Sequence, residues 1–198
     1  NPPLPPRVML HPIADGQITF SESLNIPTYP CEPFYGTMGT APELEAISSL
    51  APGVHGGNMD AADLCPGNTI RFPVQVPGAL LFLGDGHAAQ GDADVCGSAV
   101  EIPTTGTLTV DLIKGKPTYT PRVENDEYLM SIGSARPMED AARIAFYDLV
   151  TWLSTDYGFD RMAVYQLCSQ VAKVRLANMV DTLYSVVAKF PKRYLLRD

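Results

Sequence analysis

The placement of proline restricts the fold of this chain more than any other feature of its sequence. The chain has 198 residues and 18 prolines, about twice the average usage, and nearly all of these prolines precede residue 140. A proline in the interior of a helix removes a hydrogen bond and clashes with the preceding turn. We therefore expect strands and loops, rather than helices, over most of the chain up to residue 136.

Six short segments in this proline-rich part have the alternating or β-branched composition of strands. The predicted strands are residues 17–20, 34–38, 69–76, 79–83, 98–102 and 107–113. Turn signals such as Asp15-Gly16 and Lys114-Gly115 lie beside them. The sequence predicts an extended, linker-like lead over residues 1–16, which begin NPPLPP, and a β-rich domain over residues 17–136.

The pattern changes at Pro137, after which apolar residues recur at helical spacing. Pro137 suits the first turn of a helix, and Gly158 suits the position just beyond its end. Asp160 is a suitable cap for a second helix, and residues 174–180 and 184–190 then form a terminal hairpin. The fold class predicted is α+β: a β-rich, sandwich- or barrel-like body, with residues 137–198 as a helical pair and hairpin packed on it.

Charge and hydropathy argue against several classes of function. A net charge of −8 disfavours nucleic acid or an anionic membrane as a partner, and no apolar run approaches the length of a membrane span. The four cysteines are widely spaced and make no C-x-x-C pair, which argues against a zinc site closed by cysteines. Four such cysteines are compatible with a reduced protein, and we expect a soluble, cytoplasmic one.

Residues 77–101 carry most of the side chains that could take part in chemistry. An apolar segment leads into a glycine-rich loop that contains Asp85, His87, Gln90, Asp92 and Asp94. A histidine and several carboxylates at the end of a strand suit a divalent cation. Zn²⁺ can generate hydroxide near neutral pH and polarise a carbonyl, and Ca²⁺ is the alternative.

Neighbouring segments add candidates to this site. Asp60 is a plausible further ligand, and Asn58 could orient a ligand or donate to an oxyanion. On a regular strand Asp92 and Asp94 would share one face, while Glu101 would point the other way. The Asp92-x-Asp94 spacing imitates an EF-hand loop, but a proline stands where the loop needs its last glutamate, so the match fails.

Together these segments resemble the acetamidase/formamidase family. The resemblance rests on GGNMD at 56–60, PVQVPGA at 73–79 and HAAQGD at 87–92, and it extends from about residue 17 to the end. It implies a metal-dependent hydrolase that converts small amides, such as formamide or acetamide, to the carboxylic acid and ammonia. It also implies a homo-oligomer, and a site built by Asp60, Asp85, His87 and Gln90.

In the reaction that this resemblance implies, Asp60, Asp85 and His87 hold the metal. Asn58 or a backbone N–H holds the oxyanion, and Asp94 or Glu101 relays a proton to the departing ammonia.

Two departures from the family pattern leave alternatives open. The family's GDGE is here Gly91-Asp92-Ala93-Asp94, which shortens the reach of the last carboxylate by roughly 1.5 Å. Ala93 also restricts the backbone if a positive φ is needed there. The family's β-rich N-terminal portion is missing, so a separate chain could supply it, or the chain could be a fragment. The alternative function is a degenerate, non-catalytic homologue or subunit that binds a ligand or partner through the same cleft; a lactam or larger amide is a further possible substrate.

Overall fold

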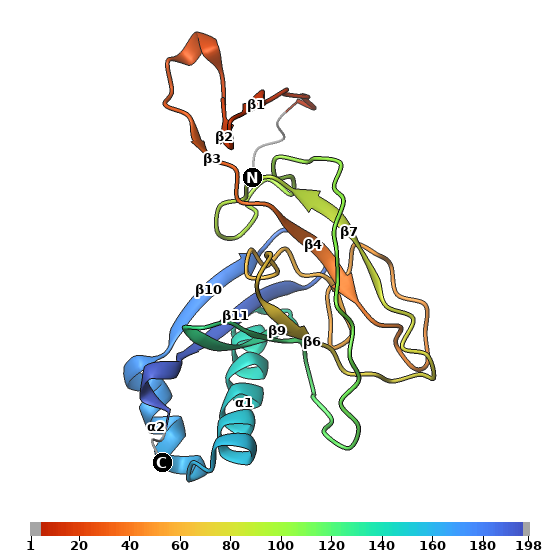
Figure 1. Cartoon of the computed structure of the whole chain (residues 1–198), viewed down its shortest axis with the longest axis vertical. Helices are drawn as coiled ribbons and strands as arrows, with labels where there is room; N and C mark the ends of the chain where they lie inside the picture. Colours follow the sequence, from red (N-terminus) through yellow and green to blue (C-terminus); the bar gives the residue numbers. More distant parts are fainter. Residues whose placement is uncertain (1–4, 196–198) are drawn as a thin grey trace.

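A computed structural model describes residues 5–195 of the chain, so the first four residues of the predicted lead lie outside the described residues. The fold is built on a five-stranded antiparallel sheet with strand order β10-β11-β9-β8-β6 (Figure 1). Its strands are β6 (Thr69–Arg71), β8 (Arg122–Glu124), β9 (Tyr128–Ala135), β10 (Lys173–Asn178) and β11 (Tyr184–Pro191). This sheet combines strands from both sides of Pro137.

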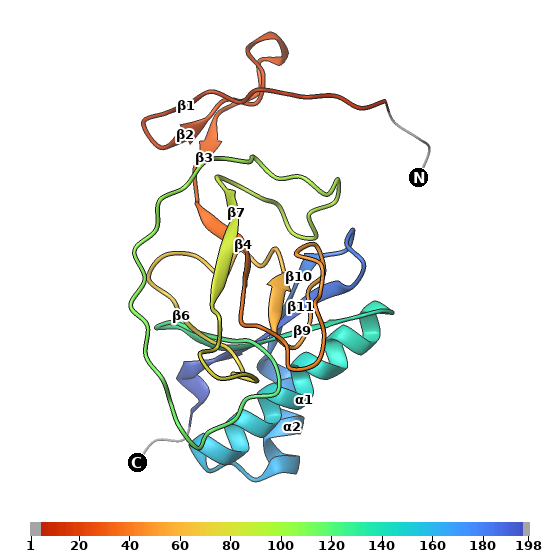
Figure 2. The same cartoon turned by 90° about the vertical axis from the view of Figure 1, so that its right-hand side faces the viewer.

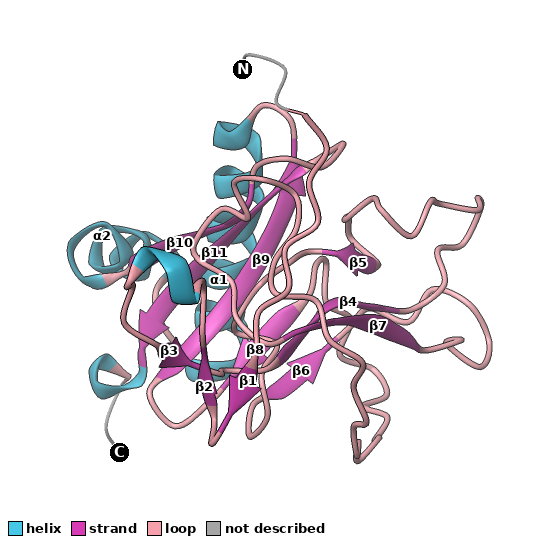
Figure 3. Cartoon of the chain, turned by 90° about the horizontal axis from the view of Figure 1, so that it is seen from above, coloured by secondary structure: helices cyan, strands magenta, loops and turns pink. Residues whose placement is uncertain are grey.

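Two smaller sheets complete the β structure. One has the order β5-β4-β7 and lies on the side of the large sheet away from the helices (Figure 3). Its strands are β4 (Phe34–Gly39), β5 (Gly56–Asn58) and β7 (Phe82–His87). The other sheet forms an arm at one end of the molecule (Figure 2), and its strands are β1 (Ile13–Ala14), β2 (Gln17–Ile18) and β3 (Tyr29–Pro30).

Both predicted helices are present, and their ends follow the signals in the sequence. Helix α1 (Met138–Tyr157) ends at Gly158, whose φ of 72° lies in the left-handed region that glycine adopts without strain. Helix α2 (Arg161–Val171) is capped by Asp160, whose side chain accepts a hydrogen bond from the backbone N–H of Ala163. None of the described helices is long and apolar enough to cross a membrane.

The core lies on both faces of the large sheet. On one face α1 packs against β9 and β11, around Leu129, Leu149, Trp152, Leu153 and Phe190. On the other face, Met38 of β4 and Met59 pack against side chains that include Met130, Ile132 and Val187. Successive side chains of β9 point to opposite faces of the large sheet. Leu129 therefore packs on the side of α1, whereas Met130 and Ile132 pack on the side of the small sheet. The α+β prediction with two late helices and a terminal hairpin is confirmed.

Several predicted strands are wrong in their bounds. The strand predicted over 69–76 ends at Arg71, and residues 98–102 contribute only a bridge between His87 and Glu101. The strand predicted over 79–83 begins instead at Phe82, because Ala79 and Leu80 form a turn with positive φ. Residues 107–113 are not in a strand. Alternation shows only that a segment can pair, and in the part of the chain that the structure describes no strand pairs with 107–113.

A buried histidine beside β5 gives the fold a predictable response to acid. His55 is 3% exposed, its Nδ1 has no hydrogen-bond partner within residues 5–195, and burial lowers its pKa below the usual 6.5 despite the charge of Glu45. The unfolded chain therefore takes up this proton more readily than the folded chain. The stabilisation that depends on neutral His55 is present above about pH 6.5 and is lost as the pH falls below it.

We expect the His55→Gln variant to lose less thermal stability than the unaltered chain between about pH 7 and about pH 5. Melting curves at several pH values measure this difference, since the carboxylates that also titrate are common to both proteins. Equal slopes for the two proteins would show that His55 takes up no proton on unfolding.

Candidate metal centre

The candidate site lies where the small sheet faces the end of the β10–β11 hairpin. Strands β4 and β7 pair antiparallel, with Phe34 opposite His87 and Thr37 opposite Gly84. Asp85 and His87 lie one residue apart on β7, and their side chains meet even though Asp85 has a φ of 61° rather than an extended conformation. Asp60 lies two residues beyond the end of β5, and its backbone N–H donates to the carbonyl oxygen of Gly36 at 3.1 Å. Pairing in this sheet thus brings together two segments far apart in the sequence.

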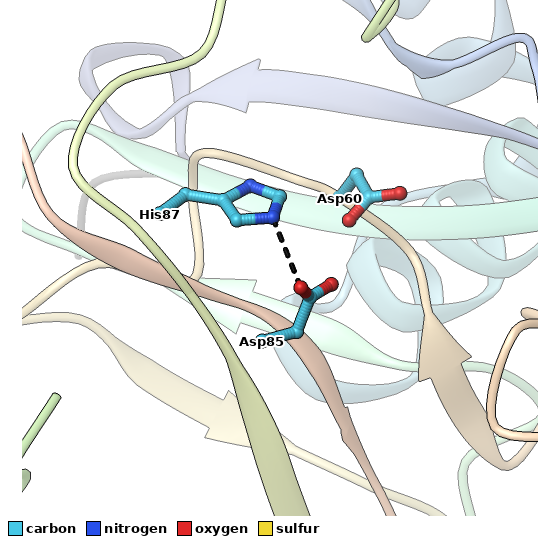
Figure 4. Close-up of side chains that lie close together, drawn as sticks. All are labelled: Asp60, Asp85 and His87. Atoms are coloured by element: carbon cyan, nitrogen blue, oxygen red, sulfur yellow. Dashed lines mark ion pairs between the residues drawn. The ribbon is translucent and has the colours of Figure 1, made fainter. Parts of the chain in front are cut away.

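Asp60, Asp85 and His87 form a compact cluster of potential ligands (Figure 4). One ligand atom from each of the three lies within 4.8 Å of the others, and His87 Nε2 lies 3.2 Å from Asp85 Oδ1. Asp60 is 1% exposed, and its Oδ1 is buried without a hydrogen-bond partner in the described chain. A buried carboxylate oxygen without a donor is costly unless a cation or proton satisfies it, so the donor set fits a divalent metal.

Because Gly36 of β4 has no side chain, the three residues of this cluster can occupy the space beside it. A Cβ atom added to Gly36 would lie 2.5 Å from Asp60 Oδ1, 2.6 Å from Asp85 Oδ2 and 3.0 Å from His87 Cε1. Only glycine can therefore stand behind the three candidate ligands without displacing them.

The His87 ring is held by Gln90, which fixes the nitrogen that faces the cluster. The Gln90 amide nitrogen donates to the backbone carbonyls of Asp60 at 2.7 Å and Ala177 at 3.2 Å. Its Oε1 must then face His87 Nδ1, at 2.9 Å, and accept its proton. Nε2 is left to face Asp85 and Glu101, which suits a metal ligand oriented by a hydrogen bond to its other nitrogen.

The acids around His87 alter one another's protonation. Burial, together with the nearby charge of Asp181, raises the pKa of Asp60 to about 7. Burial opposes protonation of His87, but its hydrogen bond to Asp85 and the charge of Glu101 outweigh burial and raise its pKa to about 9. The same hydrogen bond lowers the pKa of Asp85. The cluster thus has more negative charge than its own groups can neutralise, which favours a bound cation.

The structure brings most of the predicted site residues together, and it corrects the expected geometry of Glu101, Asp92 and Asp94. Glu101 does not point away from the loop carboxylates, because the chain turns at 92–97 and Glu101 bridges to His87, with Oε2 3.4 Å from Nε2. Asp92 and Asp94 do not share a strand face: Asp92 is exposed and paired with Arg175, whereas Asp94 is buried. Burial raises the pKa of Asp94 and that of Glu101.

The turn beside Asp94 requires the backbone conformation that glycine favours. Ala93 has a φ of 80° and Asp94 a φ of 43°. Ala93 is nevertheless fixed by two backbone hydrogen bonds, one donated to Leu176 and one accepted from Met179. The restriction expected from alanine at this position is therefore real, and neighbouring residues of the β10–β11 region hold the turn in place.

Three residues of the site carried no local signal in the sequence: Thr37, Asn178 and Asp181. The Thr37 hydroxyl lies within hydrogen-bond distance of the side-chain oxygens of Asn58 and, at 3.3 Å, of Asp85, and its single hydrogen is donated to one of them at a time. Asn178 donates to Asp60 Oδ2 at 2.5 Å, although the two are 118 residues apart. No short motif predicts such a contact, and only the pairing of β10 with β11 places Asn178 there.

A wide cleft lies beside the cluster and is lined by residues that contact it, although Asp60, Asp85 and His87 are not among the lining residues. Its volume is about 1610 Å³, and it lies between the arm and the loop that follows β7. Gln90, Asp94 and Glu101 line it, together with Phe34 and the arm residue Tyr29. The polar groups of the candidate site therefore meet an open, partly apolar space in which a small organic molecule can lie.

The chain matches a known protein family and known protein sequences. The model of the acetamidase/formamidase family matches residues 43–192. The chain is 32% identical over 117 residues to an acetamidase of Mycolicibacterium smegmatis, covering 58% of this chain and 26% of the relative. It is 39% identical over 72 residues to a formamidase of Methylophilus methylotrophus, covering 35% of this chain and 17% of the relative.

Solved structures agree with the sequence comparison. An acetamidase from Yersinia enterocolitica superimposes with a TM-score of 0.95 at 48% identity, over 100% of this chain and 59% of that chain. An acetamidase from Bacillus halodurans superimposes with a TM-score of 0.87 at 34% identity, over 93% of this chain and 61% of that chain. The chain thus spans less than two thirds of the length of these relatives.

Proposed function

Because the chain belongs to the acetamidase/formamidase family, we propose that it hydrolyses small linear amides to a carboxylic acid and ammonia. The substrates proposed are of the formamide and acetamide type, after the names of its relatives. The observation that carries the proposal is the cluster of Asp60, Asp85 and His87 around the Oδ1 atom of Asp60, which has no hydrogen-bond partner among residues 5–195.

We propose that these three residues hold a divalent metal, Zn²⁺ in preference to Ca²⁺. When bound, such a metal polarises the amide carbonyl and lowers the pKa of water to near neutrality. One imidazole and two carboxylates are ligands that zinc accepts, whereas calcium prefers six to eight oxygens. His87 must lose its Nε2 proton to act as a ligand, and a bound cation would displace that proton. Gln90 accepts the Nδ1 proton and so fixes Nε2 as the nitrogen that faces the metal.

The remaining residues supply positioning and proton transfer. Asn58 donates to Asp60 at 3.0 Å and to Asp181 at 2.7 Å, which suits the orientation of a ligand better than the binding of an oxyanion. Glu101 lies on the cleft with its side chain 48% exposed, so it can exchange protons with solvent. We propose that Glu101, or the buried Asp94, takes a proton from the attacking water and gives it to the departing ammonia.

Release of ammonia from formamide and acetamide tests this function directly. The protein is assayed as isolated, after dialysis against a chelator, and after zinc or calcium is restored. We expect activity to disappear with the chelator and to return with zinc. The Asp94→Glu variant tests the alternative of a degenerate homologue, which would gain a large activity from this change alone. No ammonia from any of these samples would overturn the proposed hydrolysis.

Two further features belong to this proposal. We propose a homo-oligomer, because four large apolar side chains of the unpaired segment 107–113 are exposed: Leu108, Val110, Leu112 and Ile113. Light scattering measures the mass in solution. We also propose a cytoplasmic location, since all four cysteines are free, as is usual in a reducing compartment.

A further inference from the structure

The two oxygens of the Asp60 carboxylate have opposite environments. Oδ1 has no hydrogen-bond partner in the described chain, whereas Oδ2 accepts hydrogen bonds from two amide groups. The donors are Asn58 Nδ2 at 3.0 Å and Asn178 Nδ2 at 2.5 Å. Oδ2 is thus saturated by donors that a metal ion cannot replace, and only Oδ1 is free to bind a cation.

The same two amides are held on their other side by Asp181. Asn58 Nδ2 donates to Asp181 Oδ2 at 2.7 Å, and Asn178 Nδ2 donates to the same atom at 2.6 Å. Each amide nitrogen therefore donates both of its hydrogens, one to Asp60 and one to Asp181. This closed arrangement of two amides and two carboxylates fixes the rotation of the Asp60 carboxylate.

Asn178 is placed in this arrangement by an irregularity of the hairpin. The register of β10 against β11 shifts between Leu176 and Asn178, and such a bulge re-aims a side chain. Asn178 is fully buried, and its Oδ1 accepts from the backbone N–H groups of Val180, at 2.9 Å, and Asp181, at 3.1 Å. Its oxygen thus caps the turn, while its nitrogen is committed to the two carboxylates.

We infer that Asn178 is a positioning residue that limits Asp60 to a single ligating oxygen and so selects zinc over calcium. This inference rests on the proposed function of the site. Zinc is satisfied by one oxygen from a carboxylate in a four-coordinate centre. Calcium needs more oxygens and commonly takes two from one carboxylate, which the hydrogen bonds to Oδ2 prevent here.

Metal titration of an Asn178→Ser variant tests the inference without reference to catalysis. Serine keeps an oxygen that can cap the turn but cannot reach Asp60 with an amide. We expect the zinc dissociation constant to rise about 10- to 100-fold, as for other residues that hold a metal ligand in place. Calcium affinity should be unchanged or tighter, because Asp60 becomes free to offer both oxygens. A purely structural defect would weaken both cations alike.

The matched control is Asn125→Ser. Asn125 caps a turn in the same way, with Oδ1 accepting from Glu127 at 3.0 Å and Tyr128 at 2.8 Å, but it is not among the residues bonded to Asp60. This variant should keep the unaltered zinc-to-calcium preference. If the Asn178→Ser protein does not fold, Asn178→Asp keeps the turn-capping oxygen and must lower the same preference.

The outcomes separate this inference from the proposed function. If the unaltered protein binds zinc and both Asn178 variants keep its preference over calcium, the inference is wrong and the proposed function stands. If the unaltered protein binds zinc selectively and the Asn178 variants lower that preference, but no ammonia is released, the hydrolysis is wrong and the positioning role stands. If the unaltered protein binds no zinc, the metal centre and the inference both fail.

Discussion

We expect the Gly36→Ala variant to lose zinc binding and, with it, amide hydrolysis. The added methyl carbon would lie 2.5 Å from Asp60 Oδ1 and 2.6 Å from Asp85 Oδ2, closer than atoms of these types approach. Asp60 cannot move aside easily, because Oδ2 and the backbone N–H are both hydrogen bonded. A catalytic constellation tolerates a displacement of only about 0.5 Å, so we expect at least a 100-fold loss of zinc affinity.

Gly84→Ala is the matched control for this experiment. Gly84 lies in β7 of the same sheet, and a Cβ atom added there would have nothing within 4 Å. Calorimetric zinc titration of both variants, with melting curves to confirm folding, separates crowding of the site from a general effect of alanine in the sheet. Zinc affinity within threefold of the unaltered value for Gly36→Ala would show that the three residues do not bind the metal together.

The residues of this site differ in how far the sequence could predict them. Asp85 and His87 are separated by one residue, so their closeness in the chain alone was enough to predict that they belong to one site, although the loop expected there is the end of strand β7. Gly36 and Asn178 belong to the site only because β4 pairs with β7 and β10 with β11. Contacts between distant segments follow from the register of the sheets, and single-sequence patterns do not specify register.

The same limit explains which elements could be predicted. Helices α1 and α2 have their own periodic faces and caps, which are local properties, and both were predicted close to their observed bounds. Strand composition at 107–113 is equally clear, yet no described strand pairs with it. A helix satisfies its own backbone, whereas a strand needs a neighbour that composition does not identify.

A buried ion pair supports the face of the large sheet away from the site. Arg122 of β8 donates two hydrogen bonds to Asp148 of α1, from Nε at 2.7 Å and from Nη2 at 2.8 Å. Ser131 adds a third donor to the same carboxylate, at 2.8 Å, and the guanidinium lies 4.9 Å from the ring centroid of Trp152. The two side chains are only 7% and 1% exposed, so each depends on the other for its charge.

We expect Asp148→Leu to destabilise the fold by about 3–5 kcal/mol, because it leaves the Arg122 guanidinium buried without a counter-charge. Urea unfolding measures the change. The Glu124→Gln variant is the control: its partners Arg71 and Lys192 are partly exposed, so its loss should stay within about 1 kcal/mol. The double variant Arg122→Met with Asp148→Leu should recover most of the stability, since it buries no charge. A double variant as unstable as Asp148→Leu would show that lost packing, and not an unpaired charge, causes the effect.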